Sequence, residues 1–459
     1  MASQTYMRWS VVTASTTAFT VCFAVWMMFA VIGIPIKTTL DLNETQFGLL
    51  VAMPVLTGSL IRVPLGMLTD RYGGRIVFFA LMLSLVIPTW ILSHATAYWH
   101  YLVLSLFVGS VGGSFAVGIT YCAHWFERER QGLAMGIFGV GNVGAAVTKF
   151  VAPSIVVAFG WQMVPQVYAV ALLVTAIAFW MATYTDPSHS ANAAKPVTLR
   201  EQLAVLKDPK VWKYCQFYSI VFGGYVALSL WMTKYYITEY AFDIKVAALL
   251  AACFSLPGGV LRAFGGWLSD RFGAHPVTWW VMLFSWVCLF FLSIPQTELT
   301  IKTIKGDLTF GIGLNVWVLT VLMFAMGVAW AVGKASVFKY ISDEFTGPTL
   351  GTVSGVVGMV GGLGGFLLPI QFGALVDLTG VNSTIFMLMW GITTVSLIWM
   401  YWTEIVPMRR VNGGGNGTRP AVEPVNVPFV FPSGKVGNPS PSGEATFAQA
   451  DVNPRAKDV

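Results

Sequence analysis

The chain has 459 residues, of which 56% are apolar and only 10% are charged. Soluble domains carry a charge at about 25% of their positions, so this composition excludes an ordinary soluble protein. The formal net charge of +6 does not by itself indicate nucleic acid, because that partner needs lysines and arginines clustered on a solvated face. Repeated apolar runs of about 20 residues indicate helices that cross a lipid bilayer. We therefore expect a polytopic membrane protein without a nucleic-acid partner.

Hydrophobic windows of about 19 residues predict twelve spans. All should be helices, because in hydrocarbon each backbone polar group must be bonded within its own segment. The predicted spans are residues 11–36, 47–69, 76–93, 100–123, 132–156, 160–184, 213–237, 246–268, 277–294, 312–338, 350–374 and 382–404. An even number puts both chain ends on one side, and lysines and arginines concentrate in the segments on that side. The positive-inside rule then predicts a multi-pass protein of the cytoplasmic membrane with cytoplasmic termini.

An internal repeat relates residues 58–75 to residues 258–275. Seven of the eighteen aligned positions are identical, and each copy begins in the second span of a six-span half. The predicted fold is therefore an all-α polytopic protein made of two pseudo-symmetric six-helix bundles. The predicted parts are an N-terminal bundle (1–184), a cytoplasmic linker (185–212), a C-terminal bundle (213–410) and a disordered cytoplasmic tail (411–459) that contains 14 glycines and prolines.

The first copy of the repeat contains Gly66-x-Leu-x-Asp70-Arg71-x-Gly73-x-Arg75. This pattern resembles the cytoplasmic loop signature of the major facilitator superfamily. The resemblance implies two halves that rock about a site near the bilayer midplane to give alternating access. It also implies a cytoplasmic gate formed by the signature residues of both copies, namely Asp70, Arg71, Arg75, Asp270 and Arg271.

Four cations fall inside the predicted spans, namely Arg62, Lys149, Arg262 and Lys334, and we count no aspartate or glutamate there. Four uncompensated cations would cost on the order of 10 kcal/mol in the bilayer, so an anion should visit them. Arg62 and Arg262 occupy equivalent repeat positions, eight residues before Asp70 and Asp270. Their planar, forked donors suit a delocalised oxyanion. The alternative is that each arginine caps carbonyls of a kinked neighbour or snorkels to the interface.

Glycine-rich runs in the fifth and eleventh spans predict close helix packing and a narrow cavity that favours a small anion. The run Gly139-Val-Gly-Asn142-Val-Gly144 and its eleventh-span partner resemble the paired signatures of the nitrate/nitrite porter family of the major facilitator superfamily. The predicted packing or gating glycines are Gly139, Gly141, Gly144, Gly358, Gly361 and Gly362.

The same resemblance implies the substrate site. Arg62 and Arg262 would clasp nitrate or nitrite, and Phe115 and Phe222 would stack on the faces of the anion. The resemblance also implies that the site is lined by Phe29, Tyr218 and Asn142. Taken one by one, such aromatic residues more often face lipid or pack in a core, so these assignments rest on the resemblance alone.

Lys149 and Lys334 stand where exchange-type relatives carry neutral polar residues, so the chain resembles the proton-coupled symporters of that family. A desolvated lysine near other cations releases a proton readily, which makes both lysines candidates for coupling nitrate import to protons. One alternative is that both lysines snorkel. Another is nitrate/nitrite exchange, which needs no titratable group because two unpaired arginines resist closure of an empty carrier.

Three further readings stay open: a porter for another small anion, a membrane anion sensor and, least favoured, an intramembrane enzyme. An enzyme is disfavoured because no carboxylate or histidine cluster is evident within the spans. We expect a transporter that acts as a monomer in the lipid bilayer, with no cofactor and no metal.

Overall fold

The computed structural model describes residues 4–126, 128–185, 204–304, 306–345 and 348–405. The predicted tail (411–459) and most of the predicted linker (185–212) lie outside this range. These described residues belong to one compact unit.

The first half of this unit begins with a long helix that is interrupted at Met28. Its elements are α1 (Gln4–Met27), α2 (Phe29–Thr39), α3 (Glu44–Leu60), α4 (Arg62–Tyr72), α5 (Gly74–Ile91), the 3-10 turn η1 (Leu92–His94), α6 (Tyr98–Gly109), η2 (Ser110–Gly113), α7 (Ser114–His124), α8 (Arg128–Gly139), η3 (Val140–Val143), α9 (Gly144–Phe159) and α10 (Met163–Ala182).

The second half has a similar succession of long helices, with a strand pair added between α16 and α17 and two π-helices. Its elements are the 3-10 turn η4 (Val205–Lys207), α12 (Pro209–Tyr218), the π-helix η5 (Ser219–Gly224), α13 (Tyr225–Tyr240), α14 (Ile244–Val260), α15 (Arg262–Phe272), α16 (Ala274–Leu292), β1 (Thr297–Thr303), β2 (Gly306–Ile312), α17 (Val316–Glu344), α18 (Pro348–Thr379), α19 (Thr384–Met400) and the π-helix η6 (Tyr401–Ile405).

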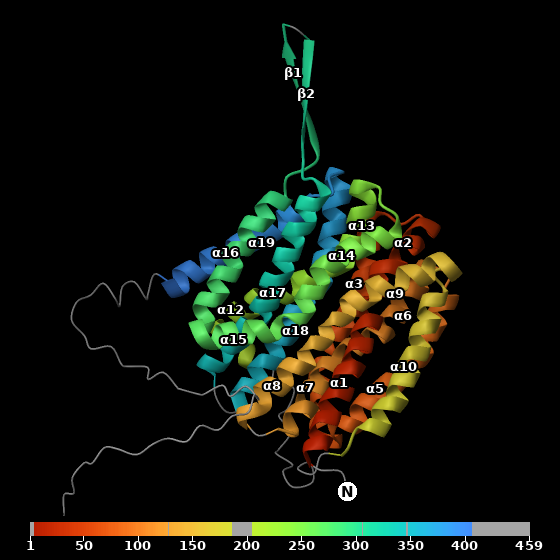
Figure 1. The fold of residues 1–459 in the computed structure, drawn as a ribbon, viewed down its shortest axis with the longest axis vertical. Helices are drawn as coiled ribbons and strands as arrows, with labels where there is room; N and C mark the ends of the chain where they lie inside the picture. The colour runs from red at the N-terminus through yellow and green to blue at the C-terminus, as the bar shows by residue number, and fades with distance from the viewer. Residues whose placement is uncertain (1–3, 127, 186–203, 305, 346–347, 406–459) are drawn as a thin grey trace, which may run out of the picture. The chain divides into compact units, whose positions relative to one another are not determined.

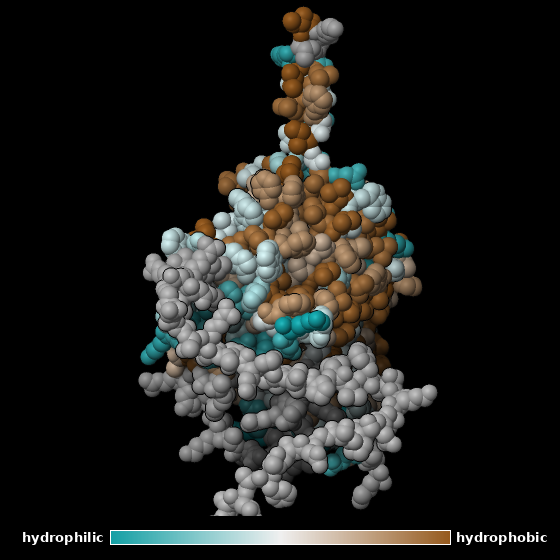
Figure 2. Space-filling model, turned by 60° about the vertical axis from the view of Figure 1, so that its left-hand side comes forward, coloured by the Kyte–Doolittle hydropathy of each residue, from teal (hydrophilic) through white to brown (hydrophobic). Residues whose placement is uncertain are grey.

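The predicted twelve spans are confirmed. Eleven helical stretches are long and apolar enough to cross a membrane, and the bent pair α14–α15 makes the twelfth. Apolar side chains cover much of the upper part of the bundle on the face that Figure 2 shows. The division into bundles 1–184 and 213–410 stays a prediction.

Both copies of the internal repeat break their helix directly before the arginine. In the first half α3 ends at Leu60 and α4 begins at Arg62; in the second half α14 ends at Val260 and α15 begins at Arg262. The second break bends the helix by 49°. The repeat therefore places each arginine at the start of a new helical segment in the interior of the bundle.

Strands β1 and β2 form a β-hairpin between α16 and α17, the one departure from an all-α fold among the described residues. Its antiparallel register pairs Leu299 with Phe310 and Ile301 with Leu308, which places these four apolar side chains on one face. Strands β1 and β2 project from one end of the bundle (Figure 1). We call this end the hairpin face. The opposite end, which holds Asp70 and Asp270, is the motif face.

The two halves pack closely along a seam between α3 and α18. A Cβ atom on Gly48 would lie 2.2 Å from the Pro369 carbonyl oxygen, and one on Gly362 would lie 2.4 Å from the Ser59 hydroxyl oxygen. Nearer the motif face, a Cβ atom on Gly66 of α4 or Gly355 of α18 would meet no atom within 4 Å. The structure is therefore closed between the halves at the hairpin face.

Candidate functional site

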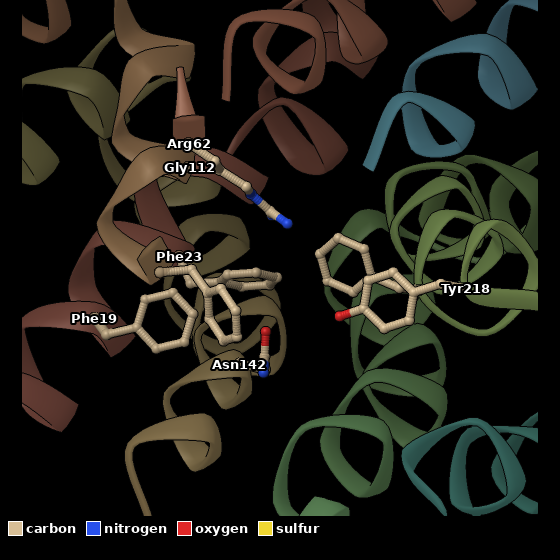
Figure 3. Close-up of a pocket in the computed structure, with 8 residues that line it drawn as sticks. Phe19, Phe23, Arg62, Gly112, Asn142 and Tyr218 are labelled. Atoms are coloured by element: carbon tan, nitrogen blue, oxygen red, sulfur yellow. The ribbon is translucent and has the colours of Figure 1, made fainter. Parts of the chain in front are cut away.

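A pocket lies between the two halves, at the level where the repeat breaks its helices. It contains about 200 Å³ of space outside the atoms, and it is so thin that this space does not admit the centre of a water-sized sphere. Its lining residues are Phe19, Phe23, Arg62, Gly112, Phe115, Asn142, Tyr218 and Phe222. Figure 3 shows Arg62 and Tyr218 reaching into it from opposite sides.

Arg62 crosses from the first half to the second. It is buried, and its Nη1 donates a hydrogen bond of 3.0 Å to the carbonyl of Gly358 in α18. Its guanidinium carbon lies 5.0 Å from the ring centre of Phe222 and 5.6 Å from that of Phe115. The glycine matters here because a side chain at position 358 would point at this guanidinium group, whose Nη1 lies 3.8 Å from the position of a Cβ atom.

Arg262 makes the symmetric crossing from the second half to the first. A Cβ atom on Gly139 of α8 would lie 3.3 Å from its Cδ, so the absence of a side chain at residue 139 leaves room for the arginine. Its guanidinium carbon is 5.4 Å from the centre of the Phe115 ring. Both arginines therefore flank the same ring, each having reached over from its own half.

Each guanidinium group keeps an unused donor. Within the described part of the chain, Nε of Arg62 and Nη1 of Arg262 are buried and have no hydrogen-bond partner. No aspartate or glutamate among the described residues forms an ion pair with either arginine. Buried donors are rarely left unpaired, and a buried cation normally has a counter-charge. The pocket therefore has the electrostatics of an anion site.

The aromatic walls come from both halves. Tyr218 and Phe222 stack with ring centres 5.1 Å apart and planes at 13°, and Tyr218 directs its hydroxyl group into the pocket (Figure 3). They bracket the start of the π-helix η5, a type of turn often found at functional sites. On the other side, Phe19 lies 5.6 Å from Phe115. The result is a slot between flat rings, with cationic and hydroxyl donors at its edges.

The glycine-rich turn of the first half shapes the floor of this slot. Asn142 in η3 donates its amide nitrogen to the Gly139 carbonyl at 2.8 Å, which leaves its side-chain oxygen toward the pocket (Figure 3). A Cβ atom on Gly141 would lie 2.4 Å from the Phe19 ring, and one on Gly144 would lie 2.3 Å from the carbonyl oxygen of Thr20. In the second half, a Cβ atom on Gly361 would lie 2.4 Å from the Tyr218 ring.

The structure brings together most of the residues predicted to bind substrate. Five of the seven line the pocket, namely Arg62, Phe115, Asn142, Tyr218 and Phe222, and Arg262 adjoins it through Phe115. Phe29 does not line it, because this buried residue begins α2, beyond the break at Met28. The prediction missed Phe19, Phe23 and Gly112. The spacing of Phe19 and Phe23, four residues apart on one helix, was the signal for a shared face.

Lys149 and Lys334 are buried in the structure and do not snorkel. Both contact α14: Lys149 Nζ donates to the Ser255 hydroxyl, and Lys334 Nζ donates to the Gly258 carbonyl at 2.5 Å. Lys334 Nζ also lies 3.5 Å from the centre of the Tyr225 ring. Within the described chain Gly258 does not accept the backbone bond from Arg262 N–H, so Lys334 serves the carbonyl that the break has freed.

The expectation of four cations and no acid inside the spans was wrong, because Glu404 is the last residue of the predicted span 382–404. Lys213 and Lys234 also lie within a predicted span and are buried in α12 and α13. Each has an acidic partner: Lys213 Nζ is 3.8 Å from Glu344 Oε1, and Lys234 Nζ is 2.5 Å from Glu44 Oε2. Glu44 is the first residue of α3. The count missed these lysines because they lie near span ends and their partners are distant in sequence.

The signature residues at the motif face contact helix ends and neighbouring helices. Arg75 donates to the Trp180 carbonyl near the end of α10 at 2.7 Å and lies over the Trp180 ring. Asp270 lies 3.8 Å from Lys339 of α17, and the guanidinium carbon of Arg271 lies 5.6 Å from the centre of the Trp267 ring. Their role in gating stays a prediction.

Comparison with known proteins identifies the class. A family model described as the Major Facilitator Superfamily matches residues 14–301. The fold is similar to a crystal structure of a bacterial homolog to the human lysosomal transporter Spinster, with a TM-score of 0.64 and 15% identity over 86% of this chain and 96% of that one. The chain is therefore a membrane transporter of this superfamily and not an enzyme.

Sequence relatives narrow the family. The chain is 37% identical to a probable nitrate/nitrite antiporter, NarK1, of Thermus thermophilus, over 87% of this chain and 92% of that protein. It is 32% identical to a probable nitrate/nitrite transporter, NarK2, of Mycobacterium tuberculosis strain H37Rv (80% and 89%) and 30% identical to the nitrite extrusion protein of Bacillus subtilis strain 168 (83% and 92%). The chain belongs to the nitrate/nitrite porter family of the major facilitator superfamily.

Proposed function

We propose that this chain imports nitrate, with nitrite as a second substrate, across the cytoplasmic membrane by alternating access. The relatives named as nitrate or nitrite transporters support the substrate class. The observation that carries the proposal is the pair of arginines between the halves: Arg62 and Arg262 come from opposite halves, flank one aromatic pocket and each keep a buried, unpaired donor. An anion bound between them would join the halves by charge-assisted hydrogen bonds.

The shape of the pocket favours a small planar anion. Its space is thin and lies between the rings of Phe115, Tyr218 and Phe222, so a flat ion fits with less displacement of side chains than a tetrahedral one. Arginine forks also match the edges of a planar oxyanion. A porter for a short carboxylate is the nearest alternative, because a carboxylate offers the same planar edge. Competition between labelled nitrate, formate and phosphate separates these substrates.

The direction of insertion follows from the distribution of cations. Arg71, Arg75 and Arg271 lie at the motif face, and cytoplasmic loops are enriched in lysine and arginine. We infer that the motif face is cytoplasmic and that the hairpin face is exposed on the other side. In this orientation the structure corresponds to a carrier closed to the outside.

Import of an anion into a cell with a negative interior costs about 2.3 kcal/mol per charge for each 100 mV, so it needs coupling. We propose that protons supply it and that Lys149 and Lys334 carry them. Both ammonium groups lie in the bundle interior and contact neutral hydroxyl, carbonyl or ring groups. Neither lysine forms an ion pair with an acidic residue in the described part of the chain, which supports a role in which each releases and rebinds a proton during the cycle.

Nitrate/nitrite exchange is the second candidate, and the relative named as an antiporter favours it. In that mechanism the two arginines would repel each other in the empty carrier, so only the loaded carrier would reorient. No proton would then need to move.

Reconstituted vesicles separate the two mechanisms when the proton gradient and the internal anion are varied independently. Symport predicts that an inward proton gradient drives labelled nitrate uptake into vesicles that contain no nitrite. Strict dependence on preloaded nitrite, without any effect of the proton gradient, would establish exchange. Absence of nitrate flux under every condition, with protein shown to be folded and inserted, would refute the proposed function.

A further inference from the structure

Three charged residues join the halves at the hairpin face, far from the arginine pocket. Glu44 begins α3 in the first half, while Lys234 of α13 and Asp377 of α18 belong to the second half. Lys234 Nζ lies 2.5 Å from Glu44 Oε2. The Asp377 carboxylate accepts hydrogen bonds from the backbone N–H of Glu44 at 3.0 Å and of Thr45 at 2.8 Å. Every one of these contacts crosses from one half to the other.

The ion pair is shielded from solvent. The Lys234 side chain is 3% exposed and that of Glu44 is 18% exposed. The rings of Phe47 and Trp231 meet edge to face beside it, with centres 5.2 Å apart, and Lys234 Nζ is 5.0 Å from the centre of the Trp231 ring. Breaking such a shielded ion pair costs free energy, because removal or withdrawal of one partner leaves the other charge unpaired where little water can reach it.

Asp377 acts as a capping residue for a helix in the other half. A helix normally receives its capping side chain from the residue before it, and Asn43 does this for α3 by accepting from Gln46 N–H at 2.8 Å. The two N–H groups between them, those of Glu44 and Thr45, donate instead to Asp377. The carboxylate also lies at the positive end of the α3 dipole. Separation of the halves removes this cap.

The charged residues around this contact are balanced in charge within each half. The first half contributes Glu44 together with Lys37, whose Nζ lies 3.3 Å from Glu44 Oε1, and the second half contributes Lys234 together with Asp377. Each half thus brings one base and one acid. When the halves separate, Glu44 keeps Lys37 as a partner, and the second half carries no net charge from these residues. The contacts therefore hold the face closed without placing a net charge in the opened entrance.

We propose that Glu44, Lys234 and Asp377 form an interhalf lock that holds the hairpin face closed when no substrate is bound. The lock sets the equilibrium between the two orientations of the carrier, whatever anion it carries. Glu239 provides a matched comparison, because it is an acid on the same α13 and accepts from Asn382 at 2.8 Å within the second half.

A cysteine at Ala52 reports opening of this face. Ala52 is buried in α3, one turn after Gly48, which meets α18 at Pro369. We would measure the rate at which a membrane-impermeant maleimide modifies A52C in nanodiscs without nitrate, and subtract the rate of the chain that has only its five native cysteines.

In the A52C background, Glu44→Gln should raise the labelling rate on the order of tenfold, because it strands the Lys234 charge in the closed state. Asp377→Asn should raise the rate as well, since a neutral amide is a weaker cap. The double variant E44Q/K234M should return at least halfway to the parent rate, because it removes both charges. Glu239→Gln should leave the rate unchanged.

The proposal is overturned if E44Q and D377N label at the parent rate, if E44Q/K234M stays as fast as E44Q, or if E239Q accelerates labelling as much as E44Q does. The last result would mean general loosening, which thermal melting of each variant measures independently. The assay uses no nitrate, so its outcome is separate from that of the transport experiment.

Discussion

Arg62→Lys tests whether the fork, and not the charge alone, binds the anion. In the structure Arg62 Nη1 donates a hydrogen bond of 3.0 Å to the Gly358 carbonyl, while the buried Nε has no hydrogen-bond partner. Arginine can therefore hold the carbonyl and an anion together. Lysine keeps the positive charge, but its side chain is shorter and has one nitrogen, which cannot bind the Gly358 carbonyl and the anion in the same way at once.

The size of the effect follows from the hydrogen bond that is lost. A hydrogen bond to a charged group contributes about 1.5–3 kcal/mol, which corresponds to a nitrate Kd raised by roughly 10-fold to 150-fold. Calorimetric titration of purified protein with nitrate at fixed ionic strength measures this directly. Arg75→Lys is the matched control, because Arg75 contacts the end of α10 at the motif face and should leave the Kd unchanged. A Kd for folded R62K within about threefold of the parent would refute the assignment.

Three further predictions address the walls of the pocket, the coupling and the packing. Phe222→Leu should weaken nitrate binding about 2-fold to 10-fold, because it removes a stacking face worth roughly 0.5–1.5 kcal/mol; the same titration checks it, and an unchanged Kd would remove Phe222 from the site. Lys149→Met should abolish uptake driven by a proton gradient while nitrate counterflow persists, whereas gradient-driven uptake at the parent rate would exclude Lys149 from coupling. Gly144→Ala should lower stability by about 1–3 kcal/mol, because its Cβ would lie 2.3 Å from the Thr20 carbonyl oxygen. Gly66→Ala, which meets nothing within 4 Å, should not lower it, and equal melting temperatures for the two variants would contradict this account.

Local sequence patterns predicted the spans and the arginine pair well, for a physical reason. A span of about 20 apolar residues in hydrocarbon has no alternative to a helix, so hydropathy alone placed all twelve. The repeat then placed Arg62 and Arg262 at the same depth, and the breaks at Ile61 and Leu261 occur at equivalent positions. These features depend on residues close together in sequence.

Features that depend on helix rotation or on partners distant in sequence were harder to predict from the sequence. Phe29 was predicted to line the pocket and does not, because the break at Met28 separates α2 from α1. A hydropathy window does not detect such a break. The Lys234–Glu44 pair joins residues 190 positions apart, so a count of charges per span could not reveal that Lys234 was compensated. The hairpin could have been predicted from the sequence, because Leu299 and Ile301 alternate with polar residues. This alternation is the period of a strand with one apolar face.

Labelled-nitrate counterflow in reconstituted vesicles tests the central claim most directly, because it requires substrate binding and reorientation but no net driving force. Vesicles loaded with unlabelled nitrate and containing the parent chain should accumulate external label transiently. Vesicles containing the R62K/R262K double variant, inserted in equal amount, should accumulate none above protein-free vesicles. Counterflow by the double variant at the parent rate would contradict the proposal that these two arginines bind the transported anion.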